Sequence, residues 1–245
     1  MSNIETRLSK FTANLLWDID GTLLNTNGIG LKYLSDATCE FTGVELENCH
    51  DNNHGLTDFE IVMRCLSNVE FSDAIKIEVV NKVIESYIER YEQAPNITSI
   101  QSYPIFNSEF FETLVSHGIG NYILTGNCYK GALLKLRQTN LDRFFDLENS
   151  FFSNKNEWRR EKIMEKALAS LDIKKTLVIG DTFRDYSLAK FFGMKSVLLN
   201  WKRDSALDTL LDRERLTVFR EEQILAGNLL RFLIDYATKL KSTPN

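Results

Sequence analysis

Short apolar runs alternate with longer amphipathic stretches over most of the chain. Residues 13–17 (Ala-Asn-Leu-Leu-Trp) are mostly apolar and end just before a carboxylate, which predicts a buried strand. Further strands are expected at 119–124, 176–179, 196–199 and 217–219. Helical periodicity predicts helices at 106–116, 129–138, 158–170, 184–192 and 221–233. This alternation of strands and helices favours an α/β fold with a parallel, doubly wound sheet.

The segment from Ile29 to about Glu92 follows a different pattern, because it offers helices and loops but no strand. Helices are expected at 29–41, 58–66 and 73–91. Gly43 is a plausible stop for the first, and Thr57 or Asp58 a plausible N-cap for the second. We therefore predict an all-helical insert over residues 26–95, with residues 1–25 and 96–245 forming the α/β core. Hinges are expected at 25–28 and near 95–104.

The composition is that of an ordinary water-exposed protein. The chain has 245 residues with 29 basic and 34 acidic side chains, a net charge of −5. No basic stretch extends into a patch, which argues against a nucleic-acid partner. The amino terminus is polar, without the apolar core of a signal peptide, and no run of about 18 apolar residues occurs, so no membrane contact is expected.

The four cysteines indicate a reducing compartment. They form no C-x-x-C pair and have no zinc-ligand spacing, so reduced thiols in a cytoplasmic protein are expected. Cys49 and His50 with His54 are the one alternative metal cluster, but no fourth ligand follows at a usual spacing.

Candidate chemistry gathers where the predicted strands end. Three strands are followed by small or acidic polar residues: Asp18 to Thr22, Thr125 to Asn127, and Asp181 with Asp185. Ligands of open α/β sheets bind at the carboxyl ends of the strands, so these residues are expected in one crevice. Crowded carboxylates repel one another, and a divalent cation such as Mg²⁺ relieves that repulsion.

Asp18 is the candidate nucleophile, since a carboxylate beside a metal and a phosphate can form an aspartyl-phosphate. Asp20 lies two residues on, so an extended backbone points both side chains to the same side. Asp20 could then protonate the leaving oxygen and later activate water. A metal would bridge Asp18, Asp181 and a phosphate oxygen. Backbone N–H groups near Gly21 and Gly126 could hold the phosphate, because glycine permits close approach.

Three stretches resemble motifs of the haloacid dehalogenase-like hydrolase superfamily. Residues 18–23 (Asp-Ile-Asp-Gly-Thr-Leu) look like its first motif, 124–127 (Leu-Thr-Gly-Asn) its second, and 180–185 (Gly-Asp-Thr-Phe-Arg-Asp) its fourth. Their order and separation also match, so the resemblance covers roughly residues 15–233. The helical insert resembles the cap of the phosphoglycolate phosphatase-like branch, and residues 55–58 (Gly-Leu-Thr-Asp) look like an element often seen in such caps.

The resemblance implies a Rossmann-like core, Mg²⁺ and a route through an aspartyl-phosphate. It implies catalytic roles for Asp18, Asp20, Thr125 and Arg160. The implied metal ligands are Asp18, Asp181, Asp185 and Asp20, the last through its backbone carbonyl. The candidate substrate-binding residues are Gly21, Thr22, Gly126 and Asn127 in the core and His54, Gly55 and Thr57 in the cap.

The third motif, a basic residue paired with the nucleophile and the phosphate, is the least defined. Arg160 fits best, because it begins the predicted helix at 158–170 and precedes Ile163. Arg159 and Lys155 stay as alternatives.

The presence of Asp20 narrows the class of reaction that the resemblance allows. In the superfamily, dehalogenases and the phosphonate-cleaving branch lack an Asp at this place, whereas an alkoxide leaving group needs a proton. We therefore expect a phosphatase that hydrolyses a small phosphorylated metabolite, acting as a monomer or homodimer. The alternatives are a phosphomutase acting on a sugar phosphate and a catalytically idle binding protein on the same fold.

Overall fold

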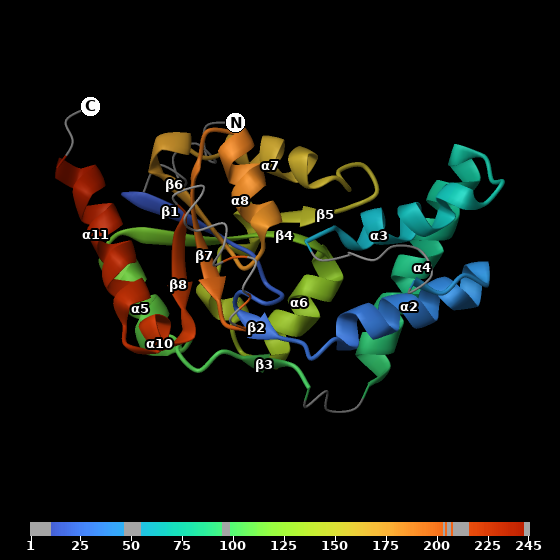
Figure 1. Cartoon of the computed structure of the whole chain (residues 1–245), viewed down its shortest axis with the longest axis horizontal. Coiled ribbons are helices and arrows are strands. Elements are labelled where there is room, and N and C mark those ends of the chain that lie inside the picture. The colour runs from blue at the N-terminus through green and yellow to red at the C-terminus, as the bar shows by residue number, and fades with distance from the viewer. Residues whose placement is uncertain are drawn as a thin grey trace.

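A parallel sheet forms the centre of the computed structural model, which describes residues 11–46, 55–94, 99–202, 204, 207 and 216–242. The sheet has six strands in the order β5-β4-β1-β6-β7-β8, and each neighbouring pair is parallel (Figure 1). Its strands are β1 (Ala13–Trp17), β4 (Ile119–Cys128), β5 (Phe151–Ser153), β6 (Thr176–Gly180), β7 (Lys195–Asn200) and β8 (Thr217–Arg220). The α/β, Rossmann-like fold class is thereby confirmed.

Strand β1 lies inside the sheet, between β4 and β6, and both of its faces are buried. Leu15 and Trp17 pack into one hydrophobic cluster, whereas Leu16 between them belongs to the cluster on the other face. This period of two is the one a pleated strand imposes. Every residue of β1 is buried, as expected of a strand inside a parallel sheet. The buried strand therefore fixes the position of Asp18, the next residue, at the carboxyl edge of the sheet.

Helices cover both faces of the sheet. One cluster includes side chains of α5 (Ser108–Ser116), α6 (Tyr129–Gln138), α10 (Glu221–Leu225) and α11 (Asn228–Ser242). The opposite cluster includes side chains of α7 (Arg160–Leu168) and α8 (Phe183–Phe191). Short 3-10 turns lie at η2 (Leu66–Asn68), η3 (Asp142–Phe144), η4 (Leu147–Asn149) and η5 (Ile173–Lys175).

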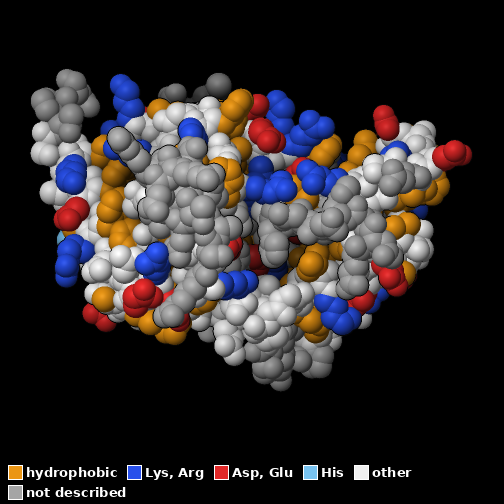
Figure 2. All heavy atoms as spheres, in the orientation of Figure 1, with side chains coloured by type: hydrophobic (Ala, Val, Ile, Leu, Met, Phe, Trp, Pro, Cys, Tyr) orange, Lys and Arg blue, Asp and Glu red, His pale blue; other side chains and the backbone are white. Residues whose placement is uncertain are grey.

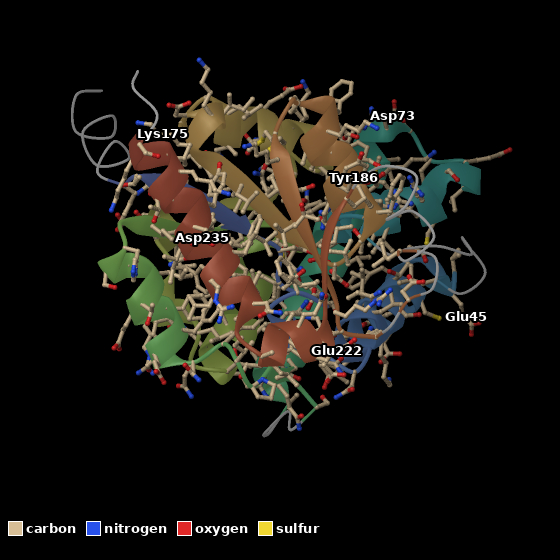
Figure 3. All side chains as sticks on the ribbon, turned by 60° about the vertical axis from the view of Figure 1, so that its left-hand side comes forward. Glu45, Asp73, Lys175, Tyr186, Glu222 and Asp235 are labelled. Carbon is tan, nitrogen blue, oxygen red and sulfur yellow. The ribbon has the colours of Figure 1, made fainter. Side chains whose placement is uncertain are left out.

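In the described residues between β2 and β3, three α-helices lie to one side of the sheet: α2 (Ile29–Thr42), α3 (Asp58–Cys65) and α4 (Asp73–Gln93). They form the right-hand part of Figure 1, and Figure 3 shows them, near the labels of Glu45 and Asp73, far from Asp235 on α11. We call them the helical insert. Thr57 is the N-cap of α3, as predicted, and Gly43 ends α2 in a left-handed conformation. The domain boundaries at 25 and 95 stay a prediction, and the second lies outside the described residues.

Two short strands join the insert to the core. β2 (Leu24–Asn25) pairs antiparallel with β3 (Gln101–Ser102), so the chain leaves and re-enters the core through one small ribbon. Sequence periodicity did not predict these strands or β5, because two or three residues carry no detectable period.

Other element boundaries also differ from the predictions. Strand β4 continues to Cys128 instead of ending at 124, and the helix expected at 158–170 begins at Arg160. The single helix expected at 221–233 is wrong: the chain forms α10 and α11, interrupted at Gly227 with φ +79°. No helix in the described part of the chain has the length and apolar character to cross a membrane.

Candidate active site

Three aspartates meet where β1 and β6 end. One carboxylate oxygen from each of Asp18, Asp181 and Asp185 can be chosen so that all three lie within 4.8 Å of one another. Asp18 follows β1 and Asp181 follows β6, and these strands are hydrogen-bonded neighbours. The sheet therefore brings together acids that are far apart in the sequence, as the motifs predicted.

Two glycines make room for this acid cluster. A Cβ on Gly21 would lie 2.0 Å from Oδ2 of Asp181, and Gly21 has φ +83°. A Cβ on Gly180 would lie 2.4 Å from Cγ of Asp185. Glycine at both positions lets the carboxylates approach the backbone. The N–H of Gly21 donates to the Leu24 carbonyl (2.8 Å) and that of Thr22 to Ile19 (3.2 Å). Their predicted contact with phosphate therefore stays a prediction.

Arg160 is the basic residue of the acid cluster. Its Nη2 lies 3.4 Å from Oδ2 of Asp18, and its Nη1 contacts Oδ1 of Asp185. Its side chain is 12% exposed, whereas Arg159 is exposed and stacks on the ring of Trp158. Lys155 is also exposed. The geometry therefore favours Arg160 among the three candidates for the third motif.

Asp185 serves both the acid cluster and the start of α8. Its Oδ2 accepts from the backbone N–H of Thr182 (3.1 Å) and from its hydroxyl (2.6 Å). The Asp185 N–H donates in return to the Thr182 hydroxyl at 3.3 Å, which completes a capping box. With Oδ1 engaged by Arg160, both oxygens of Asp185 have protein partners.

The acid cluster has more negative than positive charge. Burial raises the pKa of Asp18 to about 6; Arg160 opposes the increase, and Asp185 and Asp20 add to it. Burial, followed by Asp185 and Asp18, also raises the pKa of Asp181 well above its ordinary value. Burial itself opposes the charge of Arg160, but Asp185 and Asp18 together raise its pKa. The exposed Lys202 opposes the increase at Asp181, but Arg160 and Lys202 together still carry less charge than three carboxylates, so a cation would be favoured here.

Asp20 belongs to a second polar group, which we call the Asp20 cluster: Asp20, Asn127 and Lys135. Lys135 Nζ donates to Oδ2 of Asp20 at 2.6 Å, and Asn127 Nδ2 donates to the same oxygen at 2.8 Å. Lys135 Nζ also contacts Oδ1 of Asn127. Burial disfavours the ammonium, yet Asp20, Tyr91 and Asp58 together raise the pKa of Lys135.

The second-motif residues face the helical insert. Thr125 is buried, and its hydroxyl accepts from the backbone N–H (3.3 Å) and the side-chain amide (3.0 Å) of Asn127. A Cβ on Gly126 would lie 2.8 Å from the Leu56 carbonyl and 2.9 Å from Cα of Thr57. Glycine at 126 therefore lets the insert backbone pack directly against the end of β4.

Two of the three predicted cap residues lie at this contact. Gly55 has φ +74°, and a Cβ there would lie 2.8 Å from Cδ of Arg184. The Thr57 hydroxyl accepts from Glu60 N–H at 3.0 Å and donates to the Trp158 carbonyl at 2.5 Å. Thr57 thus caps α3 and joins it to the core, and its contact with substrate stays a prediction. His54 lies outside the described residues, as do Cys49 and His50 of the alternative metal cluster.

A cavity of about 760 Å³ lies between the core and the helical insert. Its lining includes Asp18, Asp20, Asp181 and Arg160 from the core and Leu31, Asp36 and Ile61 from the insert. In Figure 2, acidic and basic side chains are visible in the hollow between the two parts. The cavity mixes polar chemistry at the sheet edge with apolar walls from the insert, which suits a small ligand with a charged end.

The candidate site residues predicted from the sequence did not include Lys135, which the sequence analysis did not name, or Asp58, which it named only as a possible N-cap and as part of the cap element at residues 55–58. The side chain of Lys135 is 3% exposed, although α6 otherwise buries Gly131, Ala132 and Leu136. A lysine on the apolar face of a helix was the available signal. Oδ2 of Asp58 accepts from Cys128 N–H at 3.0 Å, and burial raises the pKa of Asp58 to about 6, with Lys135 opposing. Asp58 therefore joins α3 of the insert to the end of β4.

The site places a nucleophile candidate and a cluster of carboxylates at the carboxyl edge of a parallel, Rossmann-like α/β sheet. The haloacid dehalogenase-like hydrolase family matches residues 15–199, and the chain belongs to this family. The predicted superfamily and the prediction of an enzyme are thereby confirmed. The chain is 26% identical over 213 residues to the pyrophosphatase PpaX of Anoxybacillus flavithermus, covering 86% of this chain and 91% of that protein.

Solved structures support the fold. A haloacid dehalogenase-like hydrolase (family IA, variant 3) from Entamoeba histolytica has a TM-score of 0.63 at 16% identity, covering 91% of this chain and 99% of that one. A predicted phosphatase from Clostridium acetobutylicum also has a TM-score of 0.63 at 16% identity, covering 89% and 98%. The similarity extends over the helical insert as well as the sheet.

Proposed function

We propose that this enzyme is a magnesium-dependent phosphatase that hydrolyses a small phosphate monoester through an aspartyl-phosphate on Asp18. The observation that carries the proposal is the buried cluster of Asp18, Asp181 and Asp185 beside Arg160. Membership of the hydrolase family supports it, as do the names of the pyrophosphatase and phosphatase relatives.

The donor set fits Mg²⁺, which prefers carboxylate and carbonyl oxygens. Oδ1 of Asp18 is buried and has no hydrogen-bond partner among the described residues, so one nucleophile oxygen is available. Asp18, Asp181 and the backbone carbonyl of Asp20 would hold the ion, with Asp185 as the third carboxylate of the cluster. The bound ion would neutralise negative charge on the transferring phosphoryl group.

Asp18 would attack the phosphorus atom, forming an O–P bond as the bond to the leaving oxygen breaks. Asp20 would give its proton to that oxygen, releasing the alcohol. In the second step Asp20 would take a proton from water, and the resulting hydroxide would attack phosphorus, release inorganic phosphate and restore Asp18. Arg160 would orient the Asp18 carboxylate and stabilise the charge on the phosphoryl oxygens.

The helical insert, residues 26–95, would act as the cap over the cavity. Its contacts at Gly55 and Gly126 place it against the ends of β4 and α8, where it could exclude water from the phosphoryl group. The β2–β3 ribbon supplies its hinge. We expect the substrate to be a small phosphorylated metabolite whose organic part lies against the insert, in a cytoplasmic protein.

The test is phosphate release from a panel of phosphorylated metabolites and pyrophosphate, with and without Mg²⁺. Asp18→Asn should lower the rate by at least about 1,000-fold, because it removes the nucleophile. Asp73→Asn, an exposed aspartate at the start of α4, is the matched control. Borohydride reduction of enzyme quenched during turnover should convert an aspartyl-phosphate to homoserine at position 18, detected by peptide mass spectrometry. Full activity of Asp18→Asn would refute the proposal.

A further inference from the structure

A buried lysine outside the acid cluster lies against the proposed acid of the reaction. The side chain of Lys135 is 3% exposed on α6, a helix that packs against β4. Burying an ammonium group carries a large desolvation penalty unless it is paired and hydrogen-bonded. Among its charged neighbours, Asp20 is the direct ion-pair partner, at 2.6 Å. The buried position of Lys135 is therefore compensated mainly by its ion pair with Asp20.

The contacts of Lys135 and Asn127 fix one oxygen of Asp20. Oδ2 accepts from both Nζ of Lys135 and Nδ2 of Asn127, and Asn127 is itself held by Thr125 and Lys135. Oδ1 of Asp20 is buried and has no hydrogen-bond partner among the described residues. The two N–H donors therefore fix the orientation of the carboxyl group through Oδ2, and Oδ1 is the oxygen left for the reaction.

The helical insert closes around the ammonium group. The ring of Tyr91, on α4, lies with its centroid 5.9 Å from Lys135 Nζ. A Cβ on Gly30, in α2, would lie 2.9 Å from the Tyr91 hydroxyl and 3.4 Å from Nζ. Glycine at 30 therefore allows the insert to pack tightly over Lys135. This packing leaves Lys135 little freedom to release Asp20.

We propose that Lys135 is a positioning residue for Asp20: with Asn127 it holds one carboxyl oxygen so that the other is presented to the leaving group. The inference rests on the proposed role of Asp20 as acid and base. Lys135 does not itself touch the reacting atoms. Its effect is therefore largest where proton donation limits the rate and smallest where the leaving group departs without a proton.

Two aryl phosphates of similar size separate these cases. Phenyl phosphate has a poor leaving group that needs a proton, and p-nitrophenyl phosphate has a good one that does not. Asp20 is also the proposed base of the second step, which both substrates share, so the readout is the rate of leaving-group release in the first turnover, measured with Mg²⁺ by stopped flow or rapid quench. Lys135→Met should lower this rate about 100-fold for phenyl phosphate and less than about 5-fold for p-nitrophenyl phosphate. KM for both should stay within about 2-fold, because other residues hold the phosphate. The exposed Lys130→Met on the same helix is the control, with wild-type values for both substrates.

Asp20→Asn and the double variant complete the test. Asp20→Asn should show the same leaving-group dependence, and adding Lys135→Met to it should cause no further loss, because the two residues act as one unit. Equal losses in the first-turnover rate of leaving-group release on both substrates with Lys135→Met would overturn the proposal, as would additive losses in the double variant. If Lys135→Met does not fold, Lys135→Gln keeps a polar head and should show the same selective loss, and equal losses there would also overturn it.

The failure of the underlying function is distinguishable. If Asp20→Asn lowers the first-turnover rate of leaving-group release equally for both substrates, or for neither, then Asp20 is not the acid and the proposed mechanism fails, whatever Lys135→Met does. If Asp20→Asn is selective and Lys135→Met is not, the mechanism stands and the inference about Lys135 fails.

Discussion

The acid cluster and the Asp20 cluster lie at the same edge of the sheet but balance charge in different ways. In the first, Arg160 pairs with Asp18 and Asp185, Asp181 is a third acid beside them, and negative charge is in excess. In the second, the direct contacts pair one carboxylate, Asp20, with one ammonium, Lys135. The first arrangement would favour a cation from solution, whereas the direct contacts of the second pair its charges within the chain. The proposed metal site and the proposed acid–base site would therefore lie side by side.

The strongest test of this difference removes Arg160. Arg160→Met would leave two buried carboxylates without their counter-ion, so we expect the metal-free protein to lose about 3–5 kcal/mol of unfolding free energy. Arg159→Met is the matched control, because that side chain is exposed and contacts the Trp158 ring. Urea unfolding of both variants measures the difference. Equal effects would mean that Arg160 does not balance the acid cluster.

The pH dependence of the metal-free protein tests the excess charge. The pKa of Asp18 is raised from 3.8 to about 6, so the native state binds this proton more tightly than the unfolded state. The free energy of unfolding should therefore fall as pH rises through this window, by up to about 3 kcal/mol from Asp18. Asp18→Asn should reduce this fall. Thermal unfolding in EDTA across the pH range measures it, and an unchanged slope in the variant would contradict the assignment.

Magnesium should stabilise the acid cluster, and its binding should not depend on the side-chain contacts between Lys135 and Asp20. At a Mg²⁺ concentration of about 100 Kd, the gain in unfolding free energy should be about 2.7 kcal/mol. Asp181→Asn should remove most of it, and Lys135→Met should retain it. Titration of Mg²⁺ against the melting temperature gives the measurement. Loss of the response in Lys135→Met would show that the two clusters are coupled.

A smaller effect is expected where the insert meets the core. Gly55 and Gly193 both have positive φ, but a Cβ at 55 would meet Arg184 and one at 193 would meet nothing within 4 Å. Alanine at either should cost about 1–2 kcal/mol through backbone strain. Only Gly55→Ala should also lower kcat/KM, by about 10-fold, because it obstructs the packing of the insert over the acid cluster. Equal kcat/KM in the two variants would argue against a closing cap.

Most of the acid cluster could be predicted because its signals are local. Asp18 follows an apolar strand, and Asp181 follows another, so strand ends alone placed both acids at one edge. Arg160 was the favoured third-motif residue for its place at the start of a helix. Its contact with Asp185 depends on how α7 and α8 pack, which no periodicity encodes.

The Asp20 cluster could not be predicted in this way. Lys135 is 115 positions from Asp20, and a lysine on a helix is ordinarily solvated. Only the fold brings the two together, by packing α6 beside β4 under the insert. The break between α10 and α11 at Gly227 could not be predicted either. A glycine inside an apolar helical pattern is compatible with both a continuous and an interrupted helix.

Asp185 belongs both to the capping box of α8 and to the acid cluster. Asp185 ties the Thr182 N–H at the first turn of the helix and also contacts Arg160 in the acid cluster. Because both contacts use the Asp185 side chain, we expect the first turn of α8 to fray when the contact between Asp185 and Arg160 breaks. Hydrogen–deuterium exchange at the amides of Thr182 and Asp185 would serve as a substrate-free reporter of how intact the catalytic centre is.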